Sequence, residues 1–493
     1  MRLISIITIT WSCLLIPFNS LANDDNLDKF FNYHHSGRYL EAFQLVEHSN
    51  FIVNIDTLSI EYASFLGCLG ECEAELEYYD NAIKHLNKAI ELCGTPQYQG
   101  TNIHINTLFQ MATLYSFLEE DSLCSVFAEQ AWSLSKEIFQ EQSIEYCENY
   151  INYYGLSDED TIEISIIEYV KTHGDPLLKA KALYMESLET DSTFLAVQLL
   201  EMACQLYDKC DSQINYSECA IVLHTLGKKY TQIGQNKMAY RCFELSRDIY
   251  EHTHGICSYN YISSLICMGQ AKGNEGEFEY ALFLLEKAKD CAITRYGDNA
   301  IQYAWVLDTE ATVSLWANNL DKAIESQKKA NAIICTDSTE QERATIGLLS
   351  LSYMLGSNNQ HDEAQEIMNH YFDIISNKYG ENSFEYVTGL LYLSSIITDY
   401  KQSISLLEKA INMLDYFDED DCWKEMAEGH ELWAILIEQE DLQCALFHID
   451  KALEIYGSRL DFHHTDYLSA IGLKAEILYK MEQYDLSLEL FSK

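Results

Sequence analysis

Residues 265–288 read LICMGQAKGNEGEFEYALFLLEKA, and this stretch decides the fold. An LxxMG segment at 265–269 is followed, after Gly276, by two alanines seven positions apart, Ala281 and Ala288. Apolar and small residues at such spacings mark the buried stripe of a helix. A glycine between two such segments lets one helix end and the chain reverse. The stretch therefore predicts a helix, a tight turn and a second helix that packs back on the first.

The same unit recurs along the chain with a period close to 42 residues, as between positions 82 and 124, 239 and 281, 281 and 323, and 403 and 445. Small residues seven apart let two helices approach closely, so we predict that they pack between the helices of each unit. The clearest pairs are Ala82/Ala89, Ala281/Ala288, Ala323/Ala330 and Ala445/Ala452, with weaker copies at Cys124/Ala131, Ala196/Ala203, Ala239/Ser246 and Ser403/Ala410. The repeat predicts an all-α solenoid.

The pattern Leu-x-x-Leu-Ala/Gly, followed after seven residues by Gly-x-Tyr/Phe-x-x-Ala, resembles the tetratricopeptide repeat (TPR). The period and the Tyr-Gly-Asp/Glu-Asn links at 296–299 and 379–382 are similar to the longer repeats of kinesin light chains and many bacterial proteins. The resemblance implies a right-handed superhelix of about eleven or twelve helix pairs. It also implies a concave surface, lined by the first helix of each pair, that holds a peptide or protein.

The chain divides by the regularity of its repeats. We expect N-terminal TPR-like repeats over 23–140, irregular helical repeats over 141–211, and C-terminal TPR-like repeats over 212–493 with an incomplete last unit. The unit at 141–170 is short and lacks the alanine pair, so the middle region is either a bend in the solenoid or a junction between two stacks; one odd unit is tolerated in a repeat array.

The positions that line the groove depart from the resembled family. Kinesin-light-chain repeats usually carry two asparagines between the leucines of the first helix. This chain has other residues there, so the groove chemistry of that family does not carry over. The candidate groove residues are Phe109 and Gln110, His224 and Thr225, and Asp308 and Thr309.

The charge balance is strongly acidic, with 77 Asp and Glu against 32 Lys and Arg and a formal net charge of −45. Phosphate backbones and anionic membranes attract clustered cations, so nucleic acid and membrane surfaces are poor partners. A basic protein or a cationic peptide is favoured electrostatically. The alternative is that the acidic residues only keep the outer helix faces solvated.

The N-terminus has the pattern of an export signal. Arg2 precedes an apolar run at 3–18, and the small residues Ser20 and Ala22 stand before Asn23 as at a signal-peptidase site. The run is shorter than the roughly 20 residues of a membrane span.

We therefore expect residues 1–22 to be a cleaved signal peptide, and the mature protein to be periplasmic or extracellular in a bacterium. A retained N-terminal anchor, or lipidation at Cys13, is the alternative. The 15 cysteines after Cys13 are scattered singly, so we interpret them mainly as small packing residues, although an exported compartment allows some disulfides.

Motifs for catalysis or cofactor binding are missing from the sequence. It has no phosphate-binding glycine loop, nucleophile elbow, zinc-binding His-Glu-x-x-His or Cys-x-x-Cys. His173-Gly174 and His254-Gly255 superficially resemble the His-Gly of caspase-like peptidases, but no strand pattern surrounds them. The acidic run 418–421 lacks the ligand spacing of a calcium loop. We therefore expect no enzyme activity, no cofactor and no metal.

The leading hypothesis is an exported, non-catalytic scaffold that binds a protein or peptide in a concave helical groove. Leu488, Leu490 and Phe491 in the last unit would be left uncovered. This favours a second hypothesis: a sensory or regulatory arm whose C-terminal effector (a caspase-like peptidase or a membrane signalling domain) is missing, or a separate capping partner. A glycan-active helical enzyme is a minor alternative, because the chain is rich in acidic residues and tyrosine.

Overall fold

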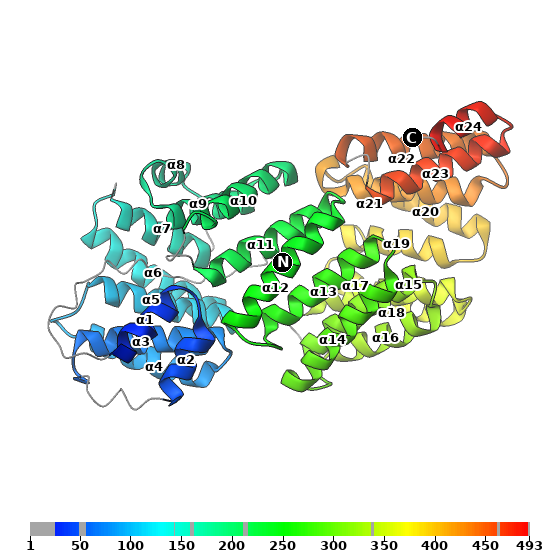
Figure 1. Cartoon of the computed structure of the whole chain (residues 1–493). Coiled ribbons are helices and arrows are strands. Elements are labelled where there is room, and N and C mark those ends of the chain that lie inside the picture. The colour runs from blue at the N-terminus through cyan, green and yellow to red at the C-terminus, as the bar shows by residue number, and fades with distance from the viewer. Residues whose placement is uncertain are drawn as a thin grey trace. The chain divides into compact units, whose positions relative to one another are not determined.

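The computed structural model describes residues 25–48, 56–141, 143–157, 162–210, 215–336, 340–460 and 464–491. Within these ranges it contains 24 α-helices and no strand, so the all-α prediction is confirmed (Figure 1). No helix in this part of the chain is long and apolar enough to cross a membrane. The predicted signal peptide, residues 1–22, lies outside the described residues.

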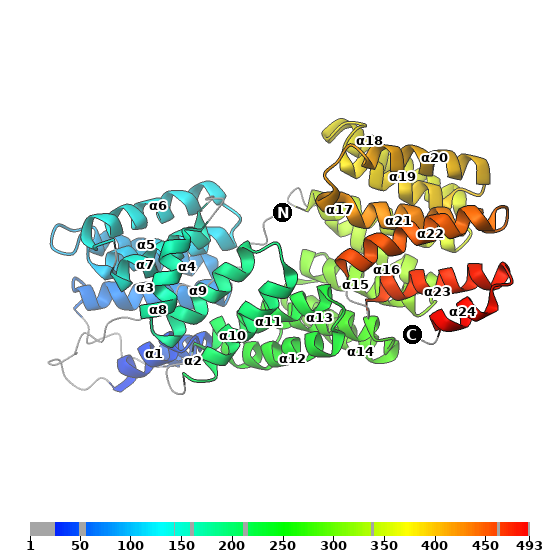
Figure 2. The same ribbon diagram turned by 90° about the horizontal axis from the view of Figure 1, so that it is seen from above.

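The helices follow one another as antiparallel pairs, in which the odd-numbered member is here called the A helix and the even-numbered member the B helix (Figures 1 and 2). The first seven A helices and six B helices are α1 (Asp25–His35), α2 (Tyr39–His48), α3 (Ile60–Glu75), α4 (Tyr79–Cys93), α5 (Asn102–Phe117), α6 (Asp121–Ile138), α7 (Ile144–Leu156), α8 (Ile164–His173), α9 (Pro176–Glu189), α10 (Thr193–Tyr207), α11 (Tyr216–Gln232), α12 (Asn236–Thr253) and α13 (Tyr259–Asn274). The remainder are α14 (Phe278–Tyr296), α15 (Ile301–Trp316), α16 (Leu320–Ile334), α17 (Gln341–Ser357), α18 (His361–Lys378), α19 (Phe384–Ile396), α20 (Tyr400–Leu414), α21 (Glu419–Ile437), α22 (Leu442–Arg459), α23 (Thr465–Lys480) and α24 (Tyr484–Phe491).

Small residues lie where the two helices of a pair meet. The side chains of the eight predicted packing alanines are completely buried; they are Ala82, Ala89, Ala281, Ala288, Ala323, Ala330, Ala445 and Ala452. A Cβ atom on Gly227 of α11 would lie 2.6 Å from the ring of Phe243 on α12, and one on Gly269 would lie 2.8 Å from Leu285. The pairs therefore pack with their backbones close together, as the sequence repeat predicts.

The chain forms two compact units, and the division between them falls within α13. Unit 1 comprises Met1–Gln232 and Lys237–Met268, and unit 2 comprises Ile233–Asn236 and Gly269–Lys493. Each unit has its own apolar clusters between successive pairs. The sequence boundaries at 140 and 211 were drawn from repeat regularity, and both lie inside unit 1.

The stretch 141–211 is helical but less regular than its surroundings. Its second helix, α8, has only ten residues and ends at Gly174, whose N–H donates to Val170 O. A Cβ on Gly174 would lie 2.8 Å from the same carbonyl oxygen. The next helix restarts at once at Pro176, with the Asp175 side chain accepting a hydrogen bond from Leu178 N. A proline in the first turn needs no N–H partner, so the chain changes direction here without a long loop.

Most cysteines serve as packing residues. Within the described part of the chain thirteen are free thiols, and Cys257 and Cys291 are disulfide-bonded. Cys72, Cys93 and Cys124 are among those that are buried. Burial raises the pKa of the Cys93 thiol to about 11, which suits an inert small hydrophobe.

Candidate binding surface: the A-helix faces of the two units

The A helices of unit 1 have buried inner faces. Twelve of the sixteen residues of α5 are buried, and these buried residues occupy every side of the helix. A line of polar contacts crosses three A helices: His34 Nε2 of α1 lies 3.0 Å from Glu71 Oε2 of α3, which accepts a 2.6 Å hydrogen bond from Gln110 Nε2 of α5. The cavity beside these residues measures about 20 Å³, room for about one water molecule.

A second polar contact ties the next A helices of unit 1. Lys181 of α9, itself buried, donates a 2.6 Å hydrogen bond to Asn152 Oδ1 of α7. The cavity there, also lined by Tyr184, Tyr207 and Glu218, measures about 10 Å³. Neither cavity can admit a peptide, so the inner face of unit 1 is closed in this structure.

The candidate groove residues of unit 1 therefore lie inside the protein or only partly at its surface. Phe109 is fully buried, and Gln110 is occupied by its bond to Glu71. His224 and Thr225 are half-buried, and the ring of His224 packs edge-on against Phe243 with centroids 5.2 Å apart. Burial, with a smaller contribution from Lys228, lowers the pKa of His224 to about 3. The imidazole is therefore neutral at pH 7.

The third candidate pair, Asp308 and Thr309, lies on α15 of unit 2. Asp308 Oδ1 accepts a 2.8 Å hydrogen bond from Gln327 of α16, and the Thr309 hydroxyl donates to Trp305 O within its own helix. Both are half-buried. Their polar groups are thus satisfied inside unit 2.

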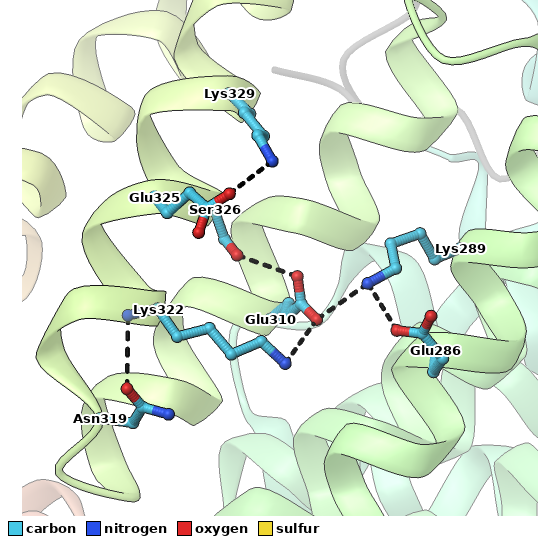
Figure 3. A network of polar contacts seen from close by, with 8 residues as sticks. All are labelled: Glu286, Lys289, Glu310, Asn319, Lys322, Glu325, Ser326 and Lys329. Atoms are coloured by element: carbon cyan, nitrogen blue, oxygen red, sulfur yellow. Dashed lines mark hydrogen bonds and ion pairs between the residues drawn. The ribbon is translucent and has the colours of Figure 1, made fainter.

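Glu310, which interrupts the apolar pattern of α15, is buried within a network of opposite charges (Figure 3). Its carboxylate lies 3.1 Å from Lys289 Nζ of α14 and 3.0 Å from Lys322 Nζ of α16. Ser326 of α16 donates a third contact at 2.9 Å. Burial alone would raise the pKa of Glu310, but the hydrogen bond from Lys322 and the charge of Lys289 outweigh it and lower the pKa. The network joins α15 to both flanking B helices.

The A helices of unit 2 expose polar and aromatic side chains. Tyr353 of α17 is 43% exposed, and its ring meets the half-buried ring of Tyr392 of α19 edge-on, with centroids 6.5 Å apart. Next along the stack, α21 presents Glu425, Glu428 and Glu431. We call these five residues the tyrosine–carboxylate face.

Electrostatic coupling shows that the members of this face lie near one another. Withdrawal from water raises the pKa of Tyr392 to about 12, and the charges of Glu428 and Glu425 add to the shift. Withdrawal from water also raises the pKa of Glu428 to about 7; Lys424, 3.8 Å away, opposes this shift, whereas Glu425 and Glu431 reinforce it. The face therefore gathers negative charge that one lysine only partly offsets.

The face continues onto α23. Ser469 is exposed and donates a 3.2 Å hydrogen bond to Glu431 Oε1, whose other oxygen accepts one from Tyr456. Tyr479, at the far end of α23, is 61% exposed. Four successive A helices of unit 2 thus contribute to one polar and aromatic surface.

The sequence analysis did not identify this face, although a signal was present. Tyr353 and Tyr392 each stand eleven residues before the first small residue of the next B helix, Ala364 and Ser403 respectively. The same register in two repeats places both rings on the same face of their helices. The candidate groove residues correspond to the asparagine positions of the resembled family, and those positions lie elsewhere on the A helix.

Comparison with known proteins gives the fold and little else. No protein-family model matches the chain, and no curated protein does. Among solved structures, a Rap protein complexed with competence and sporulation factor is 13% identical over 72% of this chain and 98% of its own, with a TM-score of 0.51. The fold is that of a TPR-like repeat solenoid.

Other solved structures align less well. A Rap conjugation gene regulator in complex with the Phr* peptide covers 72% of this chain and 95% of its own at 14% identity, with a TM-score of 0.47. A putative kinesin light chain from Podosopora anserina with nearly identical TPR-like repeats covers 39% of this chain and 92% of its own at 18% identity, with a TM-score of 0.35.

Proposed function

We propose that this solenoid is an exported, non-catalytic scaffold that binds a protein or peptide through the tyrosine–carboxylate face of unit 2. The observation that carries the proposal is the juxtaposition of Tyr353, Tyr392 and Glu428 from three successive A helices, of which Tyr353 and Glu428 are exposed and Tyr392 is half-buried. Repeat solenoids use such extended surfaces to bind partners. A solved structure of similar fold is a Rap protein complexed with competence and sporulation factor, which supports a peptide or protein as the partner.

The chemistry of the face favours a basic partner. Carboxylates attract Lys and Arg side chains, and a tyrosine ring binds a cation above its face. The formal net charge of −45 draws cationic partners towards the whole molecule. In unit 1 the corresponding polar groups of the A helices are bonded to one another, so unit 2 is the better candidate.

A binding assay with matched charge reversals tests this proposal. The mature chain is immobilised and probed with peptide libraries of equal length that are basic, neutral or acidic. We expect the basic peptides to bind best, and Glu428→Lys to weaken binding by at least about tenfold, because a repelling charge replaces an attracting one. Glu454→Lys on α22 is the control, since Glu454 is exposed and pairs with Lys451, three residues before it in the same helix.

Two results would count against the proposal. Equal binding of basic, neutral and acidic peptides would remove the charge argument. An equal loss of affinity in both charge-reversal variants would place the binding surface away from α21. The same assay with oligosaccharides covers the glycan alternative.

Export is part of the proposal. The N-terminal pattern at 1–22 supports cleavage before Asn23 and a periplasmic or extracellular site of action. Disulfide-bonded cysteines, here Cys257 and Cys291, also suit an oxidising compartment.

A second proposal concerns α24. Tyr484, Leu486 and Leu488 of this helix are each half exposed or more. Solenoids normally cover the apolar surface at their ends with a polar capping helix. We propose that a further segment, from this chain or another, packs on α24. Replacing Leu488 with Glu should then abolish association with that segment, whereas unchanged association in gel filtration would disprove it.

A further inference from the structure

The first helical hairpin of unit 1 is bonded to segments about 180 residues further along the chain. Ser36 O, in the turn between α1 and α2, accepts a 3.0 Å hydrogen bond from Tyr216 N at the start of α11. Gly37 has φ +67°, and a Cβ there would lie 2.4 Å from Asn215 Oδ1, so only glycine fits. The last turns of α3 reach the link between α12 and α13, where Glu77 accepts a 3.2 Å hydrogen bond from Tyr259 N. These contacts close the inner face of unit 1.

Two buried histidine–glutamate pairs lie at this closure, one on each side of Tyr39. His254 Nε2, at the end of α12, lies 3.0 Å from Glu75 Oε2 of α3, and the two side chains are 1% and 5% exposed. His34 and Glu71 form the second pair, also at 3.0 Å and 2% and 5% exposed. The ring of Tyr39 is 6.0 Å from that of His34 and 5.6 Å from that of His254.

The charge of this cluster depends on bound protons. An ionised glutamate beside a neutral imidazole carries one negative charge. The pair becomes electrically neutral only when it binds one further proton. Without that proton, each pair leaves a negative charge on side chains that are 5% exposed or less, and a buried charge is costly. Among the described residues, Glu71 Oε1, Glu75 Oε1 and the Tyr39 hydroxyl have no hydrogen-bond partner that would spread such a charge.

Among the residues that the structure describes, the other groups that face the cluster do not supply a compensating cation. The ring of His35 lies 5.4 Å from that of His34, and burial, with a smaller contribution from His34, lowers the pKa of His35 to about 4. Tyr250 of α12 packs against His254 with ring centroids 5.3 Å apart, and burial raises its pKa well above the ordinary value. Cys72 of α3 and Glu218 of α11 act on Tyr39, and both would add negative charge when ionised. Thr253 lies 2.7 Å from His254 Nδ1 and is uncharged.

We propose that the His254–Glu75 contact is a proton-dependent clasp that holds α1–α3 against α11 and the α12–α13 link, and that it opens as the pH rises. Burial, opposed by His254, raises the pKa of Glu75. A group with a raised pKa stabilises the closed form at low pH and loses that contribution as the pH rises, which gives the direction of the switch.

Hydrogen exchange on the mature full-length chain tests the clasp. The amides of Tyr216 and Tyr259 donate across the closure, so their protection factors, corrected for the chemical effect of pH, report on it. We expect these two protection factors to fall by about tenfold or more as the pH rises from about 4.5, close to the ordinary glutamate pKa, to about 8.5, while amides in the middle of α5 to α10 keep theirs.

Two conservative variants on the same helix separate the clasp from a general effect of pH. Glu75→Gln cannot ionise and should keep both amides protected at the higher pH. Glu73→Gln should behave like the wild type, because Glu73 pairs with His85 on α4, away from the closure. Far-UV circular dichroism at both pH values checks that each variant is folded.

The clasp is disproved if the wild type shows no fall, if Glu75→Gln falls as much as the wild type, or if Glu73→Gln is equally resistant. Should Glu75→Gln fail to fold, the wild type alone decides: a fall spread evenly over unit 1 would mean general unfolding and would overturn the proposal. The result is independent of whether unit 2 binds a partner.

Discussion

Glu310 of α15 and Lys322 of α16 are 3.0 Å apart, and this contact explains how an acid occupies an apolar position of the repeat. Glu310 is 2% exposed, and the packing around it would ordinarily exclude a charge. Lys289 on the preceding B helix approaches the same carboxylate, so cations from both sides neutralise it (Figure 3). The repeat has thus exchanged an apolar contact for a charged one that joins three successive helices.

Removing this charge should destabilise unit 2. Glu310→Gln leaves two ammonium groups without their shared partner, and we expect a loss of roughly 1–3 kcal/mol in the free energy of unfolding, because both lysines are partly solvated and Lys289 keeps Glu286. Urea denaturation followed by circular dichroism measures the change. Glu325→Gln, in the exposed pair with Lys329, is the control and should leave the midpoint unchanged.

The same network makes unit 2 sensitive to acid. The pKa of Glu310 is lowered in the folded state, so its stabilising contribution is complete above the unfolded pKa and is lost as the pH falls through the folded one. Below about pH 4 the wild type should therefore lose stability faster than Glu310→Gln. Parallel curves of stability against pH for the two proteins would contradict this account.

Gly347 on α17 should be intolerant of any side chain. A Cβ there would lie 2.3 Å from Asn331 Oδ1 of α16, and Asn331 also donates a 2.9 Å hydrogen bond to Gly347 O. We expect Gly347→Ala to cost about 1–2 kcal/mol, since the overlap outweighs the helix propensity gained. Gly472→Ala on α23, where nothing lies within 4 Å of the added atom, should instead stabilise by about 0.5–1 kcal/mol. If Gly347→Ala and Gly472→Ala changed the melting temperature equally, packing around the glycine would not determine the effect of the added methyl group.

Binding of a basic peptide should depend on pH through Glu428. Its pKa is raised to about 7, so the carboxylate becomes fully charged only above neutrality. Affinity for a cationic peptide should therefore rise between about pH 6 and about pH 8, and Glu428→Gln should flatten that rise. Titration calorimetry at a series of pH values measures it. A rise of the same size in Glu428→Gln would assign the effect to another group.

Thiol counting tests the cysteine assignments. After removal of residues 1–22 we expect fifteen cysteines, of which thirteen are free and Cys257 and Cys291 are oxidised. A thiol reagent applied to the denatured, unreduced mature protein should label thirteen sites per chain, as counted by intact mass. The same spectrum should show Asn23 at the N-terminus; a mass that includes residues 1–22 would disprove cleavage.

The fold was predictable because the spacing of the repeated residues follows directly from the way in which helices pack. Small residues seven apart, as at Ala281 and Ala288, can only be explained by close helix packing, and that packing recurs throughout the structure. The division into compact units within α13 was not predictable. It depends on contacts between segments far apart in sequence, and the period of the repeat carries no information about them.

The candidate site was predicted less well, for the same reason. Phe109 and Gln110 occupy positions that line a groove in the resembled family, yet here they are buried, because unit 1 closes its inner face. Whether a side chain on an A helix faces solvent depends on which other helices of the superhelix pack against it. In unit 2, Tyr353 is exposed and Tyr392 is half-buried, and the register that these two tyrosines share is equally visible in the sequence.

By itself, the sequence determined the helical repeat, the pairing of successive helices and the strongly negative charge, since local spacing and composition encode each of them. Only the tertiary structure decided which polar residues are buried together, as in Glu310 with its two lysines and Glu75 with His254. Such contacts arise when helices from different repeats meet, and the free energy of a buried charge depends on partners that no local pattern specifies.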